Sequence, residues 1–170
     1  MPRQELDDFE EIVKVLCQHK TVKALYCFKQ HGDVDRLTHS LNVAKLSFLI
    51  GKKLGLDCKA LAKAGLLHDF HHSERFSIKN KKTKVFSHAL TATQNAQKIF
   101  GLTKKEENII RSHMFPLSLV PPKSKEAVLV NCVDKYCTII ELFEFWFRPR
   151  QQRERVLKVG HKYKVSNKAC

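Results

Sequence analysis

The sequence predicts an all-α protein, built as a single bundle of about seven helices. Apolar residues recur three and four positions apart along most of the 170 residues, which is the spacing of an amphipathic helix. Strand-like alternation of apolar and polar residues is scarce. The length fits one domain, and 43% hydrophobic with 28% charged residues is an ordinary balance for one packed core.

Seven segments carry the helical periodicity, and several have a recognisable start. The expected helices span residues 5–18, 21–30, 35–54, 58–69, 88–100, 103–114 and 124–147. Asp57, Ser87 and Ser124 can cap the fourth, fifth and seventh helices. Thr103 followed by Glu106 predicts a capping box at the start of the sixth helix.

Stop signals and two connections complete the expected chain path. Gly101 lies just past the fifth helix, Pro116 ends the sixth and Pro149 ends the seventh. Residues 31–34 are expected to form a loop between the second and third helices. Residues 70–87 form a long, polar and basic connection, which is typical of a substrate-contacting loop or of a mobile one.

The charge balance points to anionic partners. The chain has 31 Lys and Arg against 17 Asp and Glu, a net charge of +14. We expect residues 1–148 to form the domain and residues 149–170 to form a basic extension. Trp146, Phe147 and Tyr163 lie in or near that extension, so a nucleic-acid contact is conceivable, although no nucleic-acid motif accompanies it. The alternative is that the positive charge serves only solubility.

Cellular location is inferred from three absences in the sequence. No apolar run reaches the roughly 20 residues that a membrane helix needs. The first residues contain no apolar core of a secretory signal. The six cysteines form no Cys-x-x-Cys pair. We therefore expect a reduced, cytoplasmic protein that has no membrane partner.

Ionisable residues fall on the apolar faces of five expected helices. Buried singly, an imidazole or a carboxylate costs several kcal/mol by order of magnitude. A divalent metal would relieve that cost, because it binds neutral imidazole and ionised carboxylate. Each residue alone could be an ordinary hydrogen-bonded core residue, but together they favour a metal site. The six residues are His39, His68, Asp69, His88, His113 and Asp134.

The order His, His-Asp, His, His, Asp resembles the HD-domain superfamily of metal-dependent phosphohydrolases, in its six-ligand form that holds two metals. The resemblance covers about residues 30–143. It is similar in detail to small stand-alone bacterial HD proteins, and the segments that carry this detail are residues 31–32, 36–41, 65–70, 112–117 and 133–135. The expected fold is therefore a compact helical bundle of the HD-domain type.

The resemblance implies two divalent transition metal ions that share one carboxylate, from Asp69. It implies His39, His68 and Asp134 as the other ligands of the first ion, and His88 and His113 as those of the second. Nitrogen and oxygen donors fit Mn, Fe, Co, Ni or Zn, and the sequence does not choose between these.

The implied chemistry is hydrolysis of a phosphomonoester or phosphodiester in a nucleotide or other small phosphorylated substrate. Two ions about 3.5–4 Å apart lower the pKa of a shared water, and the resulting bridging hydroxide would attack phosphorus. Asp69 would be catalytic through its bridging position. Arg36 and Lys135 are candidates to hold the remaining phosphate oxygens, although either could equally be a solvated surface residue.

Two features keep other functions open. Phe70, His71 and His72 stand where many two-metal relatives have Ile or Val followed by Gly, which weakens a cyclic-dinucleotide phosphodiesterase assignment. His71 and His72 could contact substrate or be solvated. Mixed-valent di-iron oxygenases use a similar ligand set on the same fold. A non-catalytic metal-binding or nucleic-acid-associated module is the remaining alternative.

Overall fold

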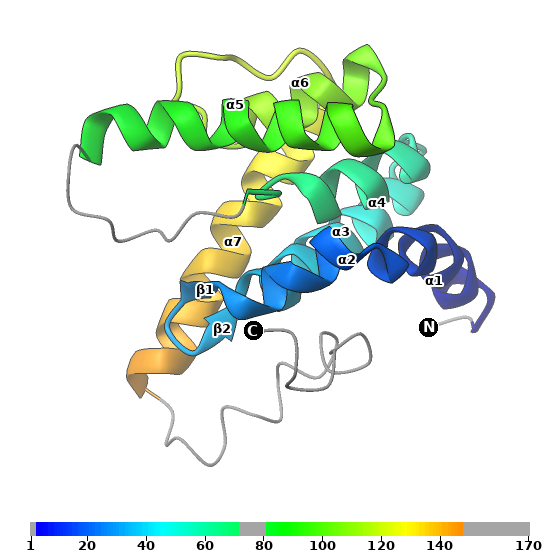
Figure 1. Cartoon of the computed structure of the whole chain (residues 1–170). Helices are drawn as coiled ribbons and strands as arrows, with labels where there is room; N and C mark the ends of the chain where they lie inside the picture. Colours follow the sequence, from blue (N-terminus) through cyan, green and yellow to red (C-terminus); the bar gives the residue numbers. More distant parts are fainter. Residues whose placement is uncertain (1–2, 72–80, 148–170) are drawn as a thin grey trace.

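Seven α-helices and one short hairpin form the part of the chain that the computed structural model describes, which is residues 3–71 and 81–147 (Figure 1). Side chains are described for residues 8–71 and 88–147. The all-α prediction is confirmed. In chain order the elements are α1 (Arg3–Gln18), α2 (Lys20–Lys23), the 3-10 helix η1 (Ala24–Cys27), β1 (Lys29–His31), β2 (Val34–Asp35), α3 (Arg36–Lys53), α4 (Cys58–Leu67), α5 (Lys81–Phe100), α6 (Lys104–Ser112) and α7 (Lys125–Phe147).

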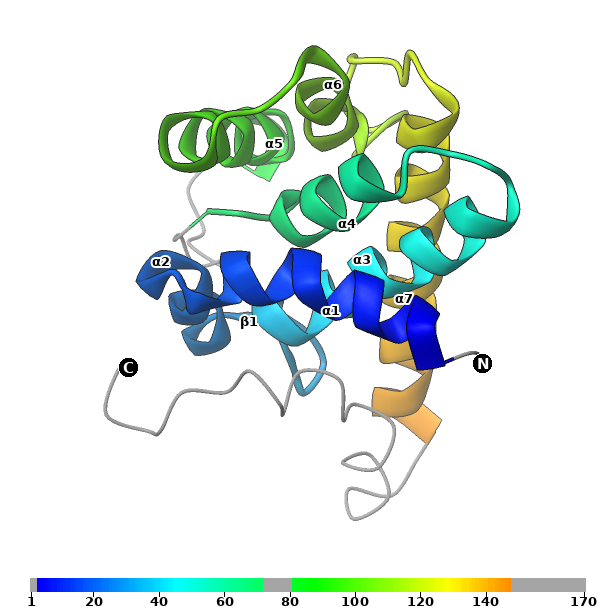
Figure 2. The same cartoon turned by 90° about the vertical axis from the view of Figure 1, so that its right-hand side faces the viewer.

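Helix α4 lies at the centre of the bundle. It contacts α1, α3, α5, α6 and α7, and Figure 2 shows it between α5 and α6 on one side and α1 and α3 on the other. Its sequence explains this position, because seven of its ten residues are buried and they are distributed around the helix. The residues that follow its last turn, His68 and Asp69, therefore lie buried in the middle of the molecule.

Gly65 allows α3 and α4 to pack backbone against backbone. A Cβ at this position would lie 2.9 Å from Ala44 Cα and 3.3 Å from Ala44 N. Those atoms belong to the buried middle of α3 and cannot swing aside as a side chain end could. A side chain at position 65 would push α4 away from α3.

We expect Gly65→Ala to destabilise the fold by about 1–3 kcal/mol, the usual cost of an overpacked core. For a chain of this length the melting temperature should fall by roughly 2–4 °C per kcal/mol. Lys59→Ala, at an exposed position of the same helix, is the control and should melt close to wild type. Equal melting temperatures for Gly65→Ala and wild type would contradict the close approach.

Three of the four predicted helix starts are confirmed. Asp57 accepts a hydrogen bond from the backbone N–H of Ala60 at 3.0 Å. The Thr103 capping box is present. The hydroxyl of Ser124 accepts from the N–H of Ala127 at 3.1 Å. Each cap satisfies a backbone donor that the helix itself leaves unpaired.

The predicted start of the fifth helix at Ser87 is wrong. Helix α5 begins at Lys81 and runs through position 87, because no Pro or Gly interrupts residues 81–87. The expected connection over residues 70–87 is correspondingly shorter, and residues 72–80 lie outside the described part.

The expected helix over residues 21–30 is also wrong. The chain forms α2 and η1 and then enters β1, which pairs antiparallel with β2. Residues 31–34 are thus the turn of a hairpin, and not a loop between helices. Gly32 makes this turn with φ of +58°, a conformation that side chains with a Cβ rarely adopt. The two strands are only three and two residues long, too short to show an alternating pattern, which is why periodicity missed the hairpin.

The ends of the later helices follow their stop signals. Gly101 has φ of +59° directly after α5, as a residue past a helix end requires. Helix α6 ends at Ser112, ahead of the cis peptide bond between Phe115 and Pro116. Pro149 and the predicted extension over residues 149–170 lie outside the described residues. Among the helices that are described, none is long and apolar enough to cross a bilayer.

Candidate metal centre

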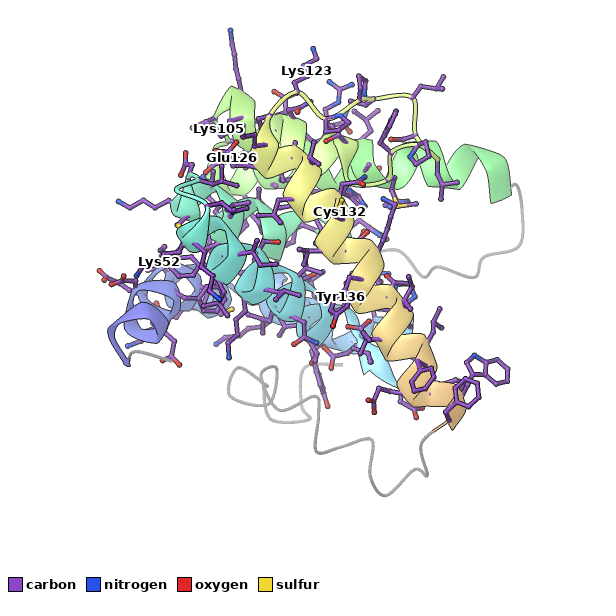
Figure 3. The ribbon with its side chains drawn as sticks, turned by 180° about the vertical axis from the view of Figure 1, so that it is seen from behind. Lys52, Lys105, Lys123, Glu126, Cys132 and Tyr136 are labelled. Carbon is purple, nitrogen blue, oxygen red and sulfur yellow. The ribbon has the colours of Figure 1, made fainter. Side chains whose placement is uncertain are left out.

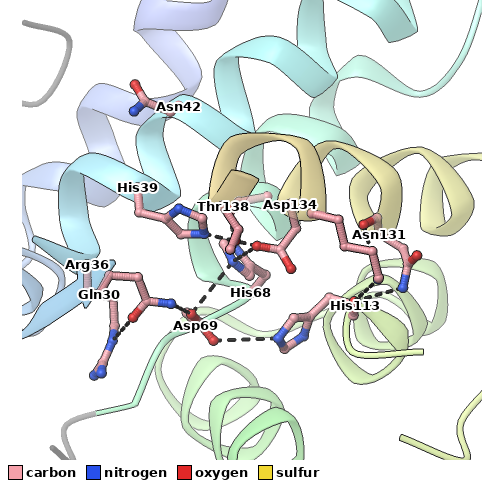
Figure 4. Close-up of polar contacts among 12 residues, drawn as sticks. Gln30, Arg36, His39, Asn42, His68, Asp69, His113, Asn131, Asp134 and Thr138 are labelled. Atoms are coloured by element: carbon pink, nitrogen blue, oxygen red, sulfur yellow. Dashed lines mark hydrogen bonds and ion pairs between the residues drawn. The ribbon is translucent and has the colours of Figure 1, made fainter. Parts of the chain in front are cut away.

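The structure brings all six predicted ligand residues together at the centre of the bundle. They form two groups, and the nitrogen or oxygen atoms that each residue offers lie within 4.8 Å of one another in each group. Figure 4 shows five of these side chains pointing into one space from different helices. The first group is His39, His68 and Asp134, and the second is Asp69, His88 and His113.

The first group is centred on one oxygen of Asp134. His39 Nε2 lies 3.0 Å from Asp134 Oδ1, and His68 Nε2 lies 3.5 Å from the same oxygen. Helix α7 contributes the carboxylate, α3 contributes His39, and His68 follows α4. The three residues are buried.

The second group is centred on Asp69 Oδ1. His88 Nε2 and His113 Nε2 lie 3.6 Å and 3.5 Å from this oxygen and 3.2 Å from each other. The other oxygen, Asp69 Oδ2, lies 3.8 Å from His68 Nε2 in the first group. Asp69 therefore stands between the two groups, with one oxygen facing each.

His68 and His113 are oriented by the same local device. Each residue is the C-cap of its helix, α4 or α6, where carbonyl groups of the last turn lack a helical partner. Nδ1 of each ring lies 2.7 Å from such a carbonyl, that of Gly65 or of Ile110, and donates to it. With the proton on Nδ1, the lone pair of Nε2 points toward the cluster, as a metal ligand requires.

His39 is oriented by a residue that the sequence reasoning missed. His39 Nδ1 donates to Glu141 Oε2 at 2.8 Å, and both side chains are buried. Burial opposes the charged imidazole, but the hydrogen bonds to Asp134 and Glu141 outweigh it and raise the pKa of His39 to about 10. The signal was present in the spacing, because Glu141 lies two helical turns after Asp134 on the same face of α7.

We expect Glu141→Gln to weaken divalent metal binding by about 10–100-fold, the typical cost of losing a carboxylate behind a histidine ligand. Gln keeps the size and an acceptor oxygen but loses the negative charge. Titration of Mn²⁺ into the metal-free protein measures the effect. Glu107→Gln, on the surface of α6, is the matched control. Affinity unchanged in Glu141→Gln would contradict a role for Glu141 in orienting His39.

Arg36 lies behind Asp69 and is fully buried. Arg36 donates from Nε to Gln30 Oε1 at 3.0 Å and from a terminal nitrogen to the His71 carbonyl at 2.6 Å. Gln30 in turn donates to Asp69 Oδ2. Figure 4 shows this chain from Arg36 through Gln30 to the carboxylate. The placement suits a positioning residue better than the phosphate contact expected from the sequence.

Lys135 and His71 are also near the cluster. Lys135 lines the same cavity as Asp69 and Asp134, and its ammonium donates to the His113 carbonyl at 3.3 Å. Burial lowers the pKa of Lys135, and the charge of Asp134 opposes this shift. His71 is buried with Nε2 4.0 Å from Asp69 Oδ1, so it is not a solvated loop residue. His72 lies outside the described residues.

A cavity of about 320 Å³ opens on this cluster. Asp69, His88, His113 and Asp134 are among the polar residues that line it, and Met114, Leu117 and Ile139 are the apolar ones. Among the side chains that the structure describes, His68 Nε2 and Asp69 Oδ1 are buried without a hydrogen-bond partner. Such atoms are costly unless a cation meets them, so the donor set fits divalent metal ions.

Burial raises the pKa of both aspartates, but the surrounding histidines outweigh it and hold each value well below the ordinary range. His68 is the leading partner of Asp69, and His39 is that of Asp134. Both carboxylates are therefore ionised at neutral pH, ready to bind a cation.

A helical bundle with this His and Asp cluster at its centre defines a candidate metal-binding protein. The family model described as HD domain matches residues 36–139, so the chain belongs to the HD domain family, a superfamily of metal-dependent phosphohydrolases. The resemblance seen in the sequence is thereby confirmed.

Two curated relatives carry the name Ribonuclease Y. The protein from Oleidesulfovibrio alaskensis is 32% identical over 124 residues, covering 73% of this chain and 21% of the relative. The protein from Petrotoga mobilis is 28% identical over 153 residues, covering 87% of this chain and 26% of the relative. The chain thus spans about a fifth to a quarter of the length of these relatives. No solved structure matches the chain significantly.

Proposed function

We propose that the protein is a metal-dependent phosphodiesterase that acts on RNA ends or on nucleotides and uses two divalent ions. The observation that carries this proposal is the position of Asp69 between two groups of ligands at the end of one cavity. The name Ribonuclease Y of two relatives supports a phosphodiester in RNA, although the chain matches a minor part of each. The net charge of +14 favours a polyanionic substrate.

Divalent ions in this site would supply a Lewis acid that activates water near neutral pH and offsets charge on phosphoryl oxygens. We assign the ion nearest α3 to His39, His68 and Asp134, and the other to His88 and His113, with Asp69 shared. Gln30 and Arg36 hold the Asp69 carboxylate in place from behind. The Lys135 ammonium faces the cavity beside Asp134, where it would donate to a phosphate oxygen.

The cavity suits one phosphorylated unit at a time. Its volume of about 320 Å³ is at the lower end of ligand pockets. The apolar side formed by Met114, Leu117 and Ile139 gives a flat, uncharged group such as a nucleobase a place to pack. A strand end or a single nucleotide therefore fits better than the middle of a duplex.

An assay of the full chain with Mn²⁺ tests the proposal. The substrates are an end-labelled single-stranded RNA, the matching DNA, a generic phosphodiester and a generic phosphomonoester. We expect cleavage of the RNA and the diester, and loss of both activities with a chelator. The same preparation loaded with iron is tested for oxygen consumption.

Two results would overturn the proposal. One is the absence of hydrolysis of every phosphate ester with any of Mn, Fe, Co, Ni and Zn. The other is substrate-dependent oxygen uptake by the iron form without hydrolysis, which would favour the di-iron oxygenase alternative.

A further inference from the structure

The outer face of α7 is apolar although nothing in the described structure covers it. Five residues form what we call the α7 seam: Cys132, Tyr136, Ile139, Phe143 and Trp146. Of these, Ile139 also lines the cavity at the metal centre. Each is exposed, and the last four keep between 53% and 73% of their surface accessible. Figure 3 shows Cys132 and Tyr136 on the side of α7 that faces away from the bundle.

The distribution of charge on α7 is the reverse of that on a surface helix. Its four acidic residues, Glu126, Asp134, Glu141 and Glu144, are buried on the inner face. From Val128 to Phe147, every residue that is exposed is apolar, aromatic or cysteine. A contiguous row of large exposed apolar side chains usually marks a contact surface. The outer face is therefore expected to be covered by another surface.

The spacing of the seam identifies the kind of surface. Its residues follow one another at intervals of four, three, four and three, which is the spacing of a coiled-coil heptad over two repeats. Such a row can present knobs to a second helix with the same spacing. The α7 seam of another copy has this spacing by identity, and symmetric pairs are the commonest oligomers.

We propose that the protein forms a homodimer in which the α7 seams of two copies pack against each other. Four large side chains of the seam are exposed by half or more. At about 200 Å² of surface for each side chain, they offer several hundred Å² of accessible apolar surface per copy. Specific interfaces bury on average about 800 Å² per partner, so the seam with its flanking apolar residues is of the right size.

The charge of the protein gives the dimer a characteristic salt dependence. Two copies that each carry +14 repel one another, and salt screens this repulsion. Added salt should therefore strengthen self-association through an apolar seam. A nucleic acid or an anionic vesicle bound to the same face would be released by salt instead. The direction of the salt effect thus separates the proposed partner from these others.

Sedimentation of the full chain over a range of micromolar concentrations is the first test. We expect a monomer–dimer equilibrium that shifts toward dimer with added NaCl. Phe143→Glu and Trp146→Glu should each weaken dimerisation at least about 30-fold, since each puts a charge in the seam. Leu119→Glu is the matched control, because Leu119 is 83% exposed but lies outside α7. Circular dichroism should show unchanged helix content in all three variants.

Cys132 provides a second readout in the wild-type chain. It is an exposed free thiol within the seam, so its rate of alkylation, followed by mass spectrometry of its peptide, reports whether the seam is covered. We expect this rate to fall as protein concentration rises. A wild-type monomer at every concentration and salt, or a rate independent of concentration, would overturn the proposal. An alkylation rate of Cys132 that is slow at every protein concentration would indicate that residues 148–170 cover the seam. A rate that is fast at every concentration would indicate that the seam is open to solvent.

Metal binding distinguishes this proposal from the proposed function. Phe143 and Trp146 do not belong to the ligand groups or to the cavity lining, so Mn²⁺ affinity should be the same in Phe143→Glu as in wild type. Loss of the dimer with unchanged Mn²⁺ affinity would support the proposed dimer interface and would not bear on the metal centre. Retention of the dimer in both glutamate variants would overturn the seam and leave the metal centre unaffected.

Discussion

Asp69→Asn is expected to reduce metal-dependent phosphodiester hydrolysis by at least about 10³-fold in kcat/KM, because it removes the one negative charge shared by both ligand groups. The Asp69 carboxylate lies within 4 Å of His68, His88 and His113. An amide of the same shape still accepts from Gln30 but no longer balances two cations. Initial rates on the labelled RNA, with Mn²⁺ in excess, measure the effect.

The matched control is Asp57→Asn, the same substitution at the start of α4. Asn caps a helix about as well as Asp, so the fold should be retained. Its side chain is well away from the cavity lining, and rates should stay close to wild type. Activity retained in Asp69→Asn, or lost equally in the control, would contradict the assigned role of Asp69.

Removal of divalent metal should destabilise the protein. Ions that bind the native state at about 100 times their dissociation constant add roughly 2.7 kcal/mol for each independent site. For a chain of this length, each kcal/mol corresponds to about 2–4 °C in melting temperature. Calorimetry measures the melting temperature of the protein with Mn²⁺ and with a chelator. The difference between these two temperatures should be smaller in Asp69→Asn than in wild type. A melting temperature insensitive to every ion would contradict the metal centre.

The stabilisation by metal should grow with pH. In the metal-free protein the pKa of His39 is raised to about 10, so the ring carries a proton at neutral pH that an ion must displace. That proton stabilises the metal-free fold fully below the unfolded pKa of about 6.5, and the contribution is lost as pH rises toward 10. Asp69 and Asp134 have the opposite sign: their lowered pKa values stabilise above about pH 4, and the contribution is lost in acid. The metal-induced shift should therefore be larger at pH 8 than at pH 6, whereas an equal shift would contradict this competition.

The convergence of the candidate ligand residues could be predicted from the sequence because each lies on an apolar helical face or just after the end of a helix. His39 lies in the first turn of α3 and Asp134 in the middle of α7, and their periodic neighbours are buried, so their inward direction follows from a spacing of three and four. His68 and His113 follow the last turn of a helix, where the direction of the chain is still set by that helix. Periodicity thus carried most of the information about the centre.

The residues behind the ligands could not be predicted in the same way. Gln30 reaches Asp69 only because a hairpin replaces the expected helix over residues 21–30, and the hairpin depends on a tight turn at Gly32. Buried Arg36 donates to Gln30, six residues earlier in the hairpin, and to the carbonyl of His71, 35 residues later. Such tertiary contacts produce no periodic pattern of apolar residues in the sequence. Glu141 is the exception, since its spacing from Asp134 was visible.

The central claim is that the six side chains converge because they hold a pair of divalent cations. Anomalous diffraction from crystals of the full chain grown with Mn²⁺, recorded on both sides of the manganese edge, tests it most directly. We expect two anomalous peaks, one within bonding distance of His39, His68 and Asp134 and one beside His88 and His113, with Asp69 reaching both. Crystals that hold the same cluster but show no peak within it at any Mn²⁺ concentration would contradict the claim.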